Sequence, residues 1–188
     1  HPVVQNEAID PQHDISYPLL SELEQNTKIT THAVQLDLKC FFHQFPIPTA
    51  VAAYYAIKVG EGFFIPCSIA TGSRTPPLFG HLLSKALAKL AILEHSASAT
   101  VFADVFIDNI RFCSSDLGSL MRVVRTFYNF CIDLDISINE SFADLAPLTE
   151  YDHLGLTFVH PSAARPGSIT IAEQARRGHA KVAPGTNR

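Results

Sequence analysis

The chain has 188 residues, of which 47% are hydrophobic and 17% are charged. This size and composition are typical of one globular domain with its own core, and they exclude an intrinsically disordered protein. No stretch approaches the roughly 18 apolar residues that a membrane-spanning helix needs, so no membrane partner is expected. The net charge of -4 disfavours a nucleic-acid-binding protein, because neutralising phosphates usually takes an excess of Lys and Arg.

The charge is unevenly distributed along the chain. Residues 161–188 carry five cationic side chains and one acidic side chain, a net charge of +4, which leaves -8 for the first 160 residues. A basic tail of this kind is more often a solvated chain end than a binding arm. The chain opens on His1, with no starting Met and no signal peptide, and we expect a fragment of a longer polyprotein or of a broken gene.

The four cysteines are Cys40, Cys67, Cys113 and Cys131. No two of them form a CxxC pair, which disfavours a zinc site. All four lie among apolar residues, so we expect reduced thiols in the core of an intracellular protein, in either the cytoplasm or the nucleus.

The first half of the chain predicts a loop, a short helix, a strand and a hairpin. Residues 1–17 are polar and contain proline, residues 17–25 fit a short helix, and residues 34–38 form an apolar strand pattern. Residues 54–58 and 63–65 flank Gly60 and Gly62, a strong hairpin signal. Pro76 then suits the first turn of a helix. Its apolar residues recur at helical spacing, and we expect them to pack in the core: Phe79, Leu82, Leu83, Ala86, Leu87, Leu90 and Leu93.

The second half predicts another hairpin, a helix and three strands. Two apolar strands, 101–107 and 110–113, surround Asp108 and Asn109, which tolerate a tight turn. Asp116 can cap a following helix, and residues 136–138, 153–159 and 168–171 are strand patterns. This order predicts an α+β fold, a mostly antiparallel sheet backed by helices, whose middle part could be a split βαβ unit.

Two carboxylates stand out in apolar surroundings. Asp37 ends the strand 34–38, and Asp108 lies at the tip of the second hairpin. An unpaired charge beside an apolar sheet is costly and usually has a cation partner, and oxygen ligands suit Mg²⁺. Two ions about 4 Å apart could activate an attacking hydroxyl and stabilise a leaving pyrophosphate. Two aspartates that only make turn hydrogen bonds at strand ends fit this pattern as well.

Four segments resemble motifs of retrotransposon reverse transcriptases, in the order that the family has. Residues 36–47, LDLKCFFHQFPI, are similar to the family's LDLKSAFHQIPI, and residues 105–114, VFIDNIRFCS, are similar to VYIDDILIFS. Residues 64–66 and 72–79, FIP and GSRTPPLF, resemble LPFGL and SPAIF. Residues 151–156, YDHLGL, resemble the FLG strand called the primer grip. The resemblance covers about residues 10–175.

The resemblance implies the palm of an RNA-directed DNA polymerase, a nucleotidyltransferase, with partial fingers. Residues 1–30 would be a finger and connecting segment, 31–160 the palm with its catalytic motifs, and 161–188 the last strand and the basic tail. The implied partners are an RNA or DNA template with its primer, deoxynucleoside triphosphates and the rest of a retroelement polyprotein.

The resemblance also implies site residues. Asp37 and Asp108 would bind two Mg²⁺ or Mn²⁺ ions, with the main-chain carbonyl of Leu38 as a further ligand. Phe42 would be the steric gate that excludes a ribose 2′-hydroxyl, although its neighbour Phe41 could serve in its place. The remaining residues would contact the incoming nucleotide and template (Gly72, Ser73, Arg74, Pro76 and Asn109) or hold the primer end (Leu154 and Gly155).

Several positions depart from the family pattern. Asn109 replaces the second Asp of the catalytic box, and Asp104 looks like a spare carboxylate on the same strand face. The Lys of the family's Asn-x-x-Lys pattern is missing after Asn139, and the cationic finger segment would precede residue 10. We therefore expect the 188-residue chain by itself to have little or no DNA synthesis activity. Asn109 and the GSRTPPLF segment suggest a tyrosine-recombinase retroelement of the DIRS or VIPER type.

Three functions remain open from the sequence. The chain can be a polymerase palm, a degenerate retroelement remnant that keeps the fold without the chemistry, or a non-catalytic nucleic-acid-binding module with a palm-like sheet. The presence of Asp37, Asp108 and Phe42 favours enzymatic ancestry. The scarcity of Lys and Arg disfavours the binding module.

Overall fold

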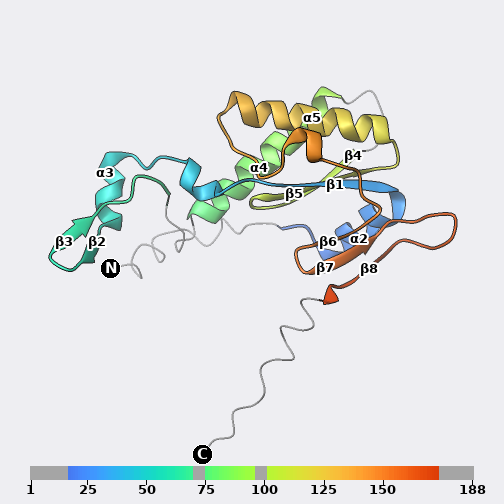
Figure 1. The fold of residues 1–188 in the computed structure, drawn as a ribbon, viewed down its shortest axis with the longest axis horizontal. Helices are drawn as coiled ribbons and strands as arrows, with labels where there is room; N and C mark the ends of the chain where they lie inside the picture. Colours follow the sequence, from blue (N-terminus) through green and yellow to red (C-terminus); the bar gives the residue numbers. More distant parts are fainter. Residues whose placement is uncertain (1–16, 70–74, 96–100, 174–188) are drawn as a thin grey trace, which may run out of the picture.

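The computed structural model describes residues 17–69, 75–95 and 101–173. Its centre is a three-stranded antiparallel sheet in the order β1-β5-β4 (Figure 1). The strands are β1 (His32–Asp37), β4 (Val101–Phe106) and β5 (Asn109–Ser114). The register places Asn109 opposite both Asp37 and Phe106, so the end of β1 lies beside the turn of the β4–β5 hairpin. The predicted α+β class, with an antiparallel sheet backed by helices, is confirmed.

Helices α4 (Thr75–Glu94) and α5 (Leu117–Asp133) cover one face of this sheet (Figure 1). Asp116 caps α5 as predicted, since its carboxylate accepts a hydrogen bond from the Gly118 N–H at 3.0 Å. Every second strand residue points at the helices, and the core joins sheet and helix residues that include Val34, Leu36, Ile110, Phe112, Ala88, Ala91, Val124 and Phe127.

The other face of the sheet is covered by α2 (Leu20–Ile29) and a second antiparallel sheet, β6-β7-β8 (Figure 1). Its strands are β6 (Glu150–His153), β7 (Leu156–Val159) and β8 (Ser168–Ile171). Ala33 and Cys113 of the central sheet point this way. They form a second, smaller core with residues of the covering elements, Leu23, Tyr151 and Phe158. Because both faces are covered, the free end of the sheet, where β1 meets the β4–β5 turn, is the place left for a site.

The buried imidazole of His153, on β6, makes the fold sensitive to acid. Burial, together with the positive charge of Arg111, lowers the pKa of His153 to about 4. The unfolded chain therefore binds a proton below about pH 6.5 that the folded chain takes up only near pH 4. The contribution of His153 to the free energy of unfolding is fully present above pH 6.5. It is lost as the pH falls toward 4, by about 3 kcal/mol.

Urea unfolding at about pH 7 and at about pH 4.5 measures this loss. His153→Gln is expected to lose clearly less stability between the two pH values than the wild type, since Gln does not titrate. Equal losses in the two proteins would contradict this assignment.

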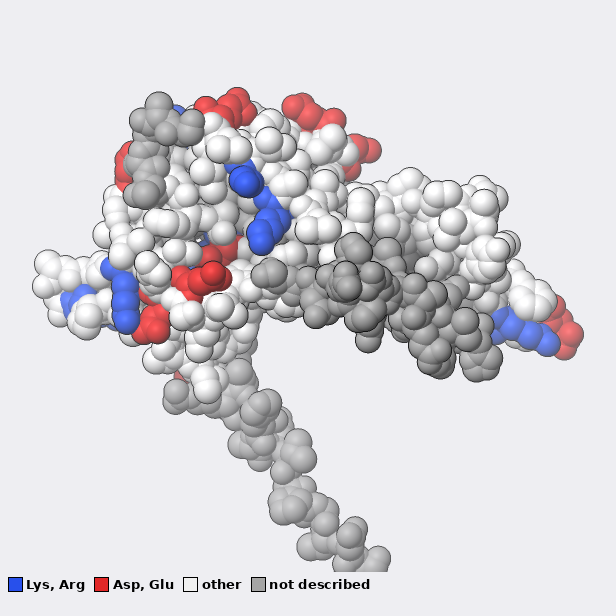
Figure 2. Space-filling view, turned by 180° about the vertical axis from the view of Figure 1, so that it is seen from behind, with Lys and Arg blue, Asp and Glu red and all other residues white. Residues whose placement is uncertain are grey.

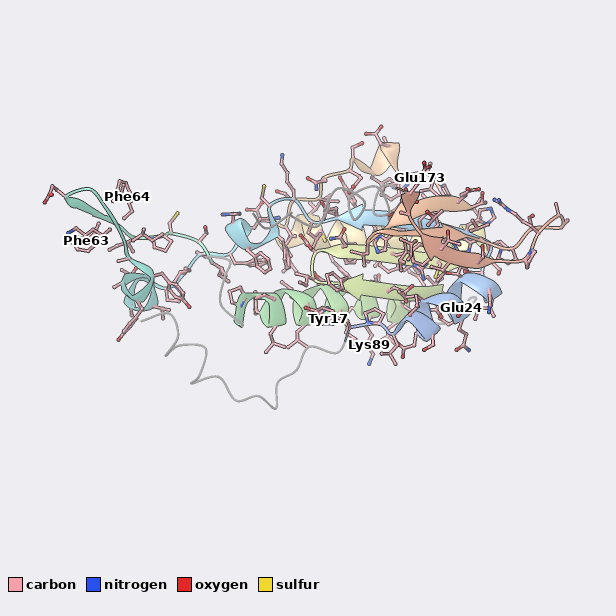
Figure 3. All side chains as sticks on the ribbon, turned by 90° about the horizontal axis from the view of Figure 1, so that it is seen from below. Tyr17, Glu24, Phe63, Phe64, Lys89 and Glu173 are labelled. Atoms are coloured by element: carbon pink, nitrogen blue, oxygen red, sulfur yellow. The ribbon has the colours of Figure 1, made fainter. Side chains whose placement is uncertain are left out.

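Residues 38–69, which follow β1, begin against the core, where Phe41 is buried, and continue as an arm that extends away from both sheets (Figures 1 and 3). This segment contains two 3-10 turns (η1, Phe41–Gln44; η2, Ala53–Tyr55), the short helix α3 (Thr49–Ala52) and a two-stranded hairpin, β2 (Ile57–Val59) and β3 (Gly62–Phe64). Phe63 and Phe64, which Figure 3 labels on this hairpin, are 70% and 63% exposed. In Figure 2 both acidic and basic side chains lie on the main body, with several acidic ones along its upper edge, and the arm carries charged side chains at its tip.

Five expectations from the sequence need correction. The apolar stripe of α4 is only partly core: Leu87 is buried, but Leu82, Leu90 and Leu93 are more than half exposed. The buried face of α4 instead uses small or polar residues such as Ser84, Ala88 and Ala91. Hydrophobic spacing alone could not distinguish these two neighbouring faces.

Two predicted strands also differ. Residues 153–159 form not one strand but the hairpin β6–β7, because Leu154 and Gly155 both have positive φ and make a tight turn. Residues 136–138 form only an isolated bridge, between Ile138 and Leu38, and are followed by the 3-10 turn η3 (Phe142–Asp144).

The remaining corrections concern a turn and the cysteines. The β4–β5 turn consists of Ile107 and Asp108, one residue earlier than expected. Cys113 and Cys131 are buried, and burial raises the pKa of each thiol to about 12, but Cys40 and Cys67 are exposed.

In the part of the chain that the structure describes, no helix is long and apolar enough to cross a membrane.

Gly80 of α4 is packed too tightly to accept a side chain. A Cβ atom there would lie 2.5 Å from Cε1 of Phe41 and 3.3 Å from Cε1 of Phe42. Gly80→Ala is therefore expected to lower the free energy of unfolding by about 1–3 kcal/mol, through displacement of these rings. At Gly118 of α5 the nearest atom would be 3.4 Å away, so Gly118→Ala should stabilise the helix by about 0.5–1 kcal/mol. Urea denaturation of both variants tests the contrast, and a neutral Gly80→Ala would contradict it.

Candidate active site

Asp37 and Asp108 come together at the free end of the central sheet. Asp37 is the last residue of β1, and Asp108 directly precedes β5, the strand that pairs with β1. The Leu38 N–H donates a hydrogen bond to the Asp108 main-chain oxygen at 3.0 Å, so the two chain segments are joined at this point. Both side chains are partly exposed. The strand pairing thus brings two carboxylates 71 positions apart in the sequence to one edge.

The turn that carries Asp108 has an unusual backbone. Ile107 has a φ of 59°, a conformation that is strained for a β-branched residue. Its N–H points at Nδ1 of the buried His81, 3.4 Å away. Next to the turn, Asn109 Nδ2 donates to the Asp108 carboxylate at 3.1 Å. In this arrangement Asn109, which replaces a family carboxylate, orients Asp108.

The pKa of Asp37 reflects its partial burial and the negative charges beside it. Partial burial raises the pKa of Asp37, and the charges of Asp108 and Glu140 raise it further, while a hydrogen bond from Asn139 opposes them. Like charges that are held together favour protonation unless a cation neutralises them. The pair is therefore arranged for a positively charged partner.

The donor atoms at this edge fit a hard divalent ion. The hydrogen bonds that flank the Leu38–Ile138 bridge are made by the main chains of Lys39 and Asp37. The N–H and the carbonyl of Leu38 therefore point to the opposite side of the strand, toward Asp108. Two carboxylates and a main-chain carbonyl are oxygen ligands, which suit Mg²⁺ or Mn²⁺. Among the described residues no three His, Cys, Asp or Glu side chains gather to hold a metal. Mg²⁺ commonly uses one or two carboxylates together with substrate phosphates, so the set present is compatible with it.

Phe42 and Phe41 differ in exposure. Phe41 is 2% exposed and belongs to the core, whereas Phe42 is half-buried at the surface of that core. The two rings are 5.7 Å apart, and both lie against Gly80 at the beginning of α4. Of the two candidates for the steric gate, Phe42 is therefore the one that a ligand could reach.

The other predicted residues are only partly placed. Pro76 is buried in the first turn of α4, and Gly72, Ser73 and Arg74 lie outside the described residues. Leu154 and Gly155 form the tip of the β6–β7 hairpin. Leu154 lines a pocket of about 320 Å³, which Phe106 at the end of β4 also lines. The predicted primer-grip hairpin and the Asp108 hairpin thus face one pocket.

Asp104 does not belong to the site. Its carboxylate is 5% exposed and is paired with the guanidinium of Arg111, with Nε 2.9 Å from Oδ2, and it also accepts a hydrogen bond from Asn26. This buried ion pair lies on the face covered by α2 and β6–β8. The spare carboxylate suggested by the sequence is therefore structural.

Two residues at the site were missed as functional by sequence reasoning. Asn139 and Glu140 both hydrogen-bond to Asp37, although they lie about 100 positions away. Asn139 was visible only as part of an incomplete motif, and Glu140 carried no signal, because its proximity depends on an isolated bridge that local sequence does not predict.

Known proteins share this fold at low sequence identity. No protein-family model and no curated protein sequence matches the chain. Three solved structures of a foamy viral protease-reverse transcriptase match the chain in structure. The first, in complex with double-stranded DNA, has a TM-score of 0.71 and 13% identity, over 96% of this chain and 29% of that chain. A second DNA complex has a TM-score of 0.66 and 13% identity, over 97% and 35%.

The third structure, with an RNA/DNA hybrid, has a TM-score of 0.64 and 12% identity, over 90% of this chain and 21% of that chain. The chain thus spans about a third or less of the proteins it resembles. At this identity the likeness establishes a reverse-transcriptase-like fold.

Proposed function

We propose that this chain is the palm of an RNA-directed DNA polymerase, which adds deoxynucleotides to the 3′ end of a primer. The observation that carries the proposal is the meeting of Asp37 and Asp108 at one end of a sheet, with like charges that call for a cation. The likeness to reverse transcriptases that are bound to nucleic acid supports the same reaction and the same class of partner.

In this proposal Asp37, Asp108 and the Leu38 carbonyl hold two Mg²⁺ or Mn²⁺ ions. Such ions, when bound, would activate the primer hydroxyl and stabilise the leaving pyrophosphate. Asn109 keeps the Asp108 carboxylate in orientation through its 3.1 Å hydrogen bond. Because phosphoryl-type transfer depends mainly on positioning and charge stabilisation, the chain's own contribution is the geometry of these carboxylates.

The neighbouring elements suggest where the substrates lie. Phe42, in η1 beside Gly80 of α4, would contact the sugar of the incoming deoxynucleoside triphosphate. Gly72, Ser73, Arg74 and Pro76 would lie against its base and the template. Leu154 and Gly155 would hold the primer end, since their hairpin shares a pocket with Phe106. A retroelement polyprotein, of the DIRS or VIPER type, is the proposed source.

Templated primer extension tests the reaction. The 188-residue chain, in excess over a labelled oligo(dT) primer on poly(rA), is incubated with dTTP and Mn²⁺ or Mg²⁺. We expect at most slow incorporation by the chain alone and faster incorporation by a chain extended at its N-terminus with a cationic finger segment, and both should need template, dTTP and metal. Primer-template binding without any incorporation by the extended chain would overturn the proposal in favour of a non-catalytic nucleic-acid-binding module. Absence of both binding and incorporation would favour an inactive retroelement remnant.

Sugar selection tests the role of Phe42. Phe42→Ala is expected to reduce the preference for dTTP over UTP by about tenfold or more, since a lost contact in a pocket changes discrimination by about 1–3 kcal/mol. Phe64→Ala, on the exposed hairpin, is the matched control and should keep the wild-type preference. Unchanged preference in Phe42→Ala, measured as the ratio of the two incorporation rates, would assign Phe42 to packing.

A further inference from the structure

Residues 137–140 lie alongside the catalytic strand end. Ile138 forms an antiparallel bridge with Leu38, flanked by hydrogen bonds from Lys39 N–H to the Ser137 oxygen (3.0 Å) and from Asn139 N–H to the Asp37 oxygen (2.8 Å). The segment therefore acts as a short additional strand beside the last residues of β1. Its position is set by main-chain pairing, which side-chain substitutions leave in place.

Two consecutive side chains of this segment bind Asp37. Asn139 Nδ2 donates a hydrogen bond to Oδ2 of the Asp37 carboxylate. The Glu140 carboxylate accepts a hydrogen bond from the Asp37 main-chain N–H at 3.0 Å. Together with the Asn139 N–H, these contacts engage the N–H, the carbonyl and the carboxylate of Asp37. The Asn139 side chain restricts the rotamer of the Asp37 carboxylate, and the two main-chain hydrogen bonds fix the backbone from which that side chain projects.

The segment is itself anchored on two sides. The Gln44 side chain, at the end of η1, accepts from the Ser137 N–H (2.6 Å) and donates to the Ser137 oxygen (3.1 Å). On the other side, the Tyr128 hydroxyl of α5 donates to the Glu140 main-chain oxygen at 3.3 Å, and the Tyr128 ring packs on Phe142. Gln44 thus joins η1, which follows the end of β1, to this segment.

We propose that Asn139 and Glu140 are positioning residues that hold the Asp37 carboxylate in the rotamer that binds a divalent cation. The inference rests on the metal site of the proposed function. Carboxylates that ligate metals are commonly held by hydrogen bonds from outside the ligand set, and loss of such a partner lowers metal affinity by about 10–100-fold. The same magnitude is expected for Asn139→Ala and Glu140→Ala.

Mn²⁺ titration of the full chain, followed by the EPR signal of free Mn²⁺, tests this directly. The matched controls are Asn129→Ala on the exposed side of α5 and Glu61→Ala on the arm, and both should keep wild-type affinity. Glu140→Gln keeps an acceptor oxygen and should recover most of the affinity that Glu140→Ala loses. Urea unfolding identifies any variant that is unfolded. If Glu140→Ala does not fold, the Mn²⁺ affinities of Asn139→Ala, at an exposed residue, and of the conservative Glu140→Gln still test the positioning role.

The outcomes separate the inference from the function on which it rests. If the wild type binds no Mn²⁺, or binds it equally well with Asp37→Asn, the metal site of the proposed function is wrong. If Mn²⁺ binding depends on Asp37 but is unchanged in Asn139→Ala and Glu140→Ala, the positioning role is overturned while the metal site stands. A Glu140→Gln affinity as low as that of Glu140→Ala would overturn the hydrogen-bonding role of Glu140.

Discussion

Asp37→Asn is expected to lower the rate of primer extension by about a thousandfold or more. Charge stabilisation by bound metal supplies several kcal/mol to such reactions, and each 1.36 kcal/mol is about a factor of ten in rate. The substitution keeps the side-chain shape and an oxygen that can accept the Asn139 hydrogen bond, so the fold should remain. In metal-free buffer the variant should even be slightly more stable, because it removes one of the crowded charges.

The measurement is single-turnover extension of a labelled primer, with protein in excess. Asp133→Asn, at the exposed end of α5, is the matched control and should extend the primer at the wild-type rate. A wild-type rate in Asp37→Asn would show that any incorporation arises elsewhere or from a contaminant.

Arg111→Met is expected to lower the free energy of unfolding by about 3–5 kcal/mol, the usual cost of leaving one partner of a buried ion pair uncompensated. Arg111 is fully buried and bonded to Asp104 of β4. Its guanidinium also donates to Thr27 of α2 (3.1 Å) and to the Tyr151 hydroxyl of β6 (3.2 Å), and it lies 4.2 Å from the Phe158 ring centroid. One side chain thus joins the β4–β5 hairpin to both elements that cover this face.

Urea denaturation tests this against an exposed ion pair. Arg165 binds Glu150 at 2.7 Å, but both side chains are about half exposed, so Arg165→Met should cost at most about 1 kcal/mol. The double variant Arg111→Met/Asp104→Leu should recover much of the loss, because it removes the orphaned charge. Equal costs for Arg111→Met and Arg165→Met would show that the buried pair does not hold the two layers together.

The sequence predicts the parts of this fold that local pattern determines. The capped helix α5, the β2–β3 hairpin and the strand β8 follow from spacing, turn residues and caps. The convergence of Asp37 and Asp108 followed from motif resemblance. The site's hydrogen bonds did not: Asn139, Glu140 and Gln44 reach Asp37 and its neighbours through bridges between distant segments, which leave no periodic trace in the chain.

Other differences between the predicted and the observed fold arise from tertiary packing and backbone turns that local sequence patterns do not show. Arg111 lies in an otherwise apolar strand pattern, and a lone arginine there gives no sign that Asp104, Thr27 and Tyr151 will surround it. The exposed face of α4 carries Leu82, Leu90 and Leu93, whereas the face toward the sheet uses Leu87 and small residues such as Ala88 and Ala91, which let the helix approach the sheet closely. Leu154 adopts positive φ beside a glycine, and the resulting turn divides what the pattern predicts as one strand.

The most direct test of a metal-dependent palm is a crystal structure of the chain grown with Mn²⁺, with anomalous scattering used to locate the ion. The proposed function predicts an anomalous peak within coordination distance of both the Asp37 and the Asp108 carboxylates, at the end of β1. A peak bound elsewhere, or an Asp37 side chain turned away from Asp108 with no ion between them, would contradict it.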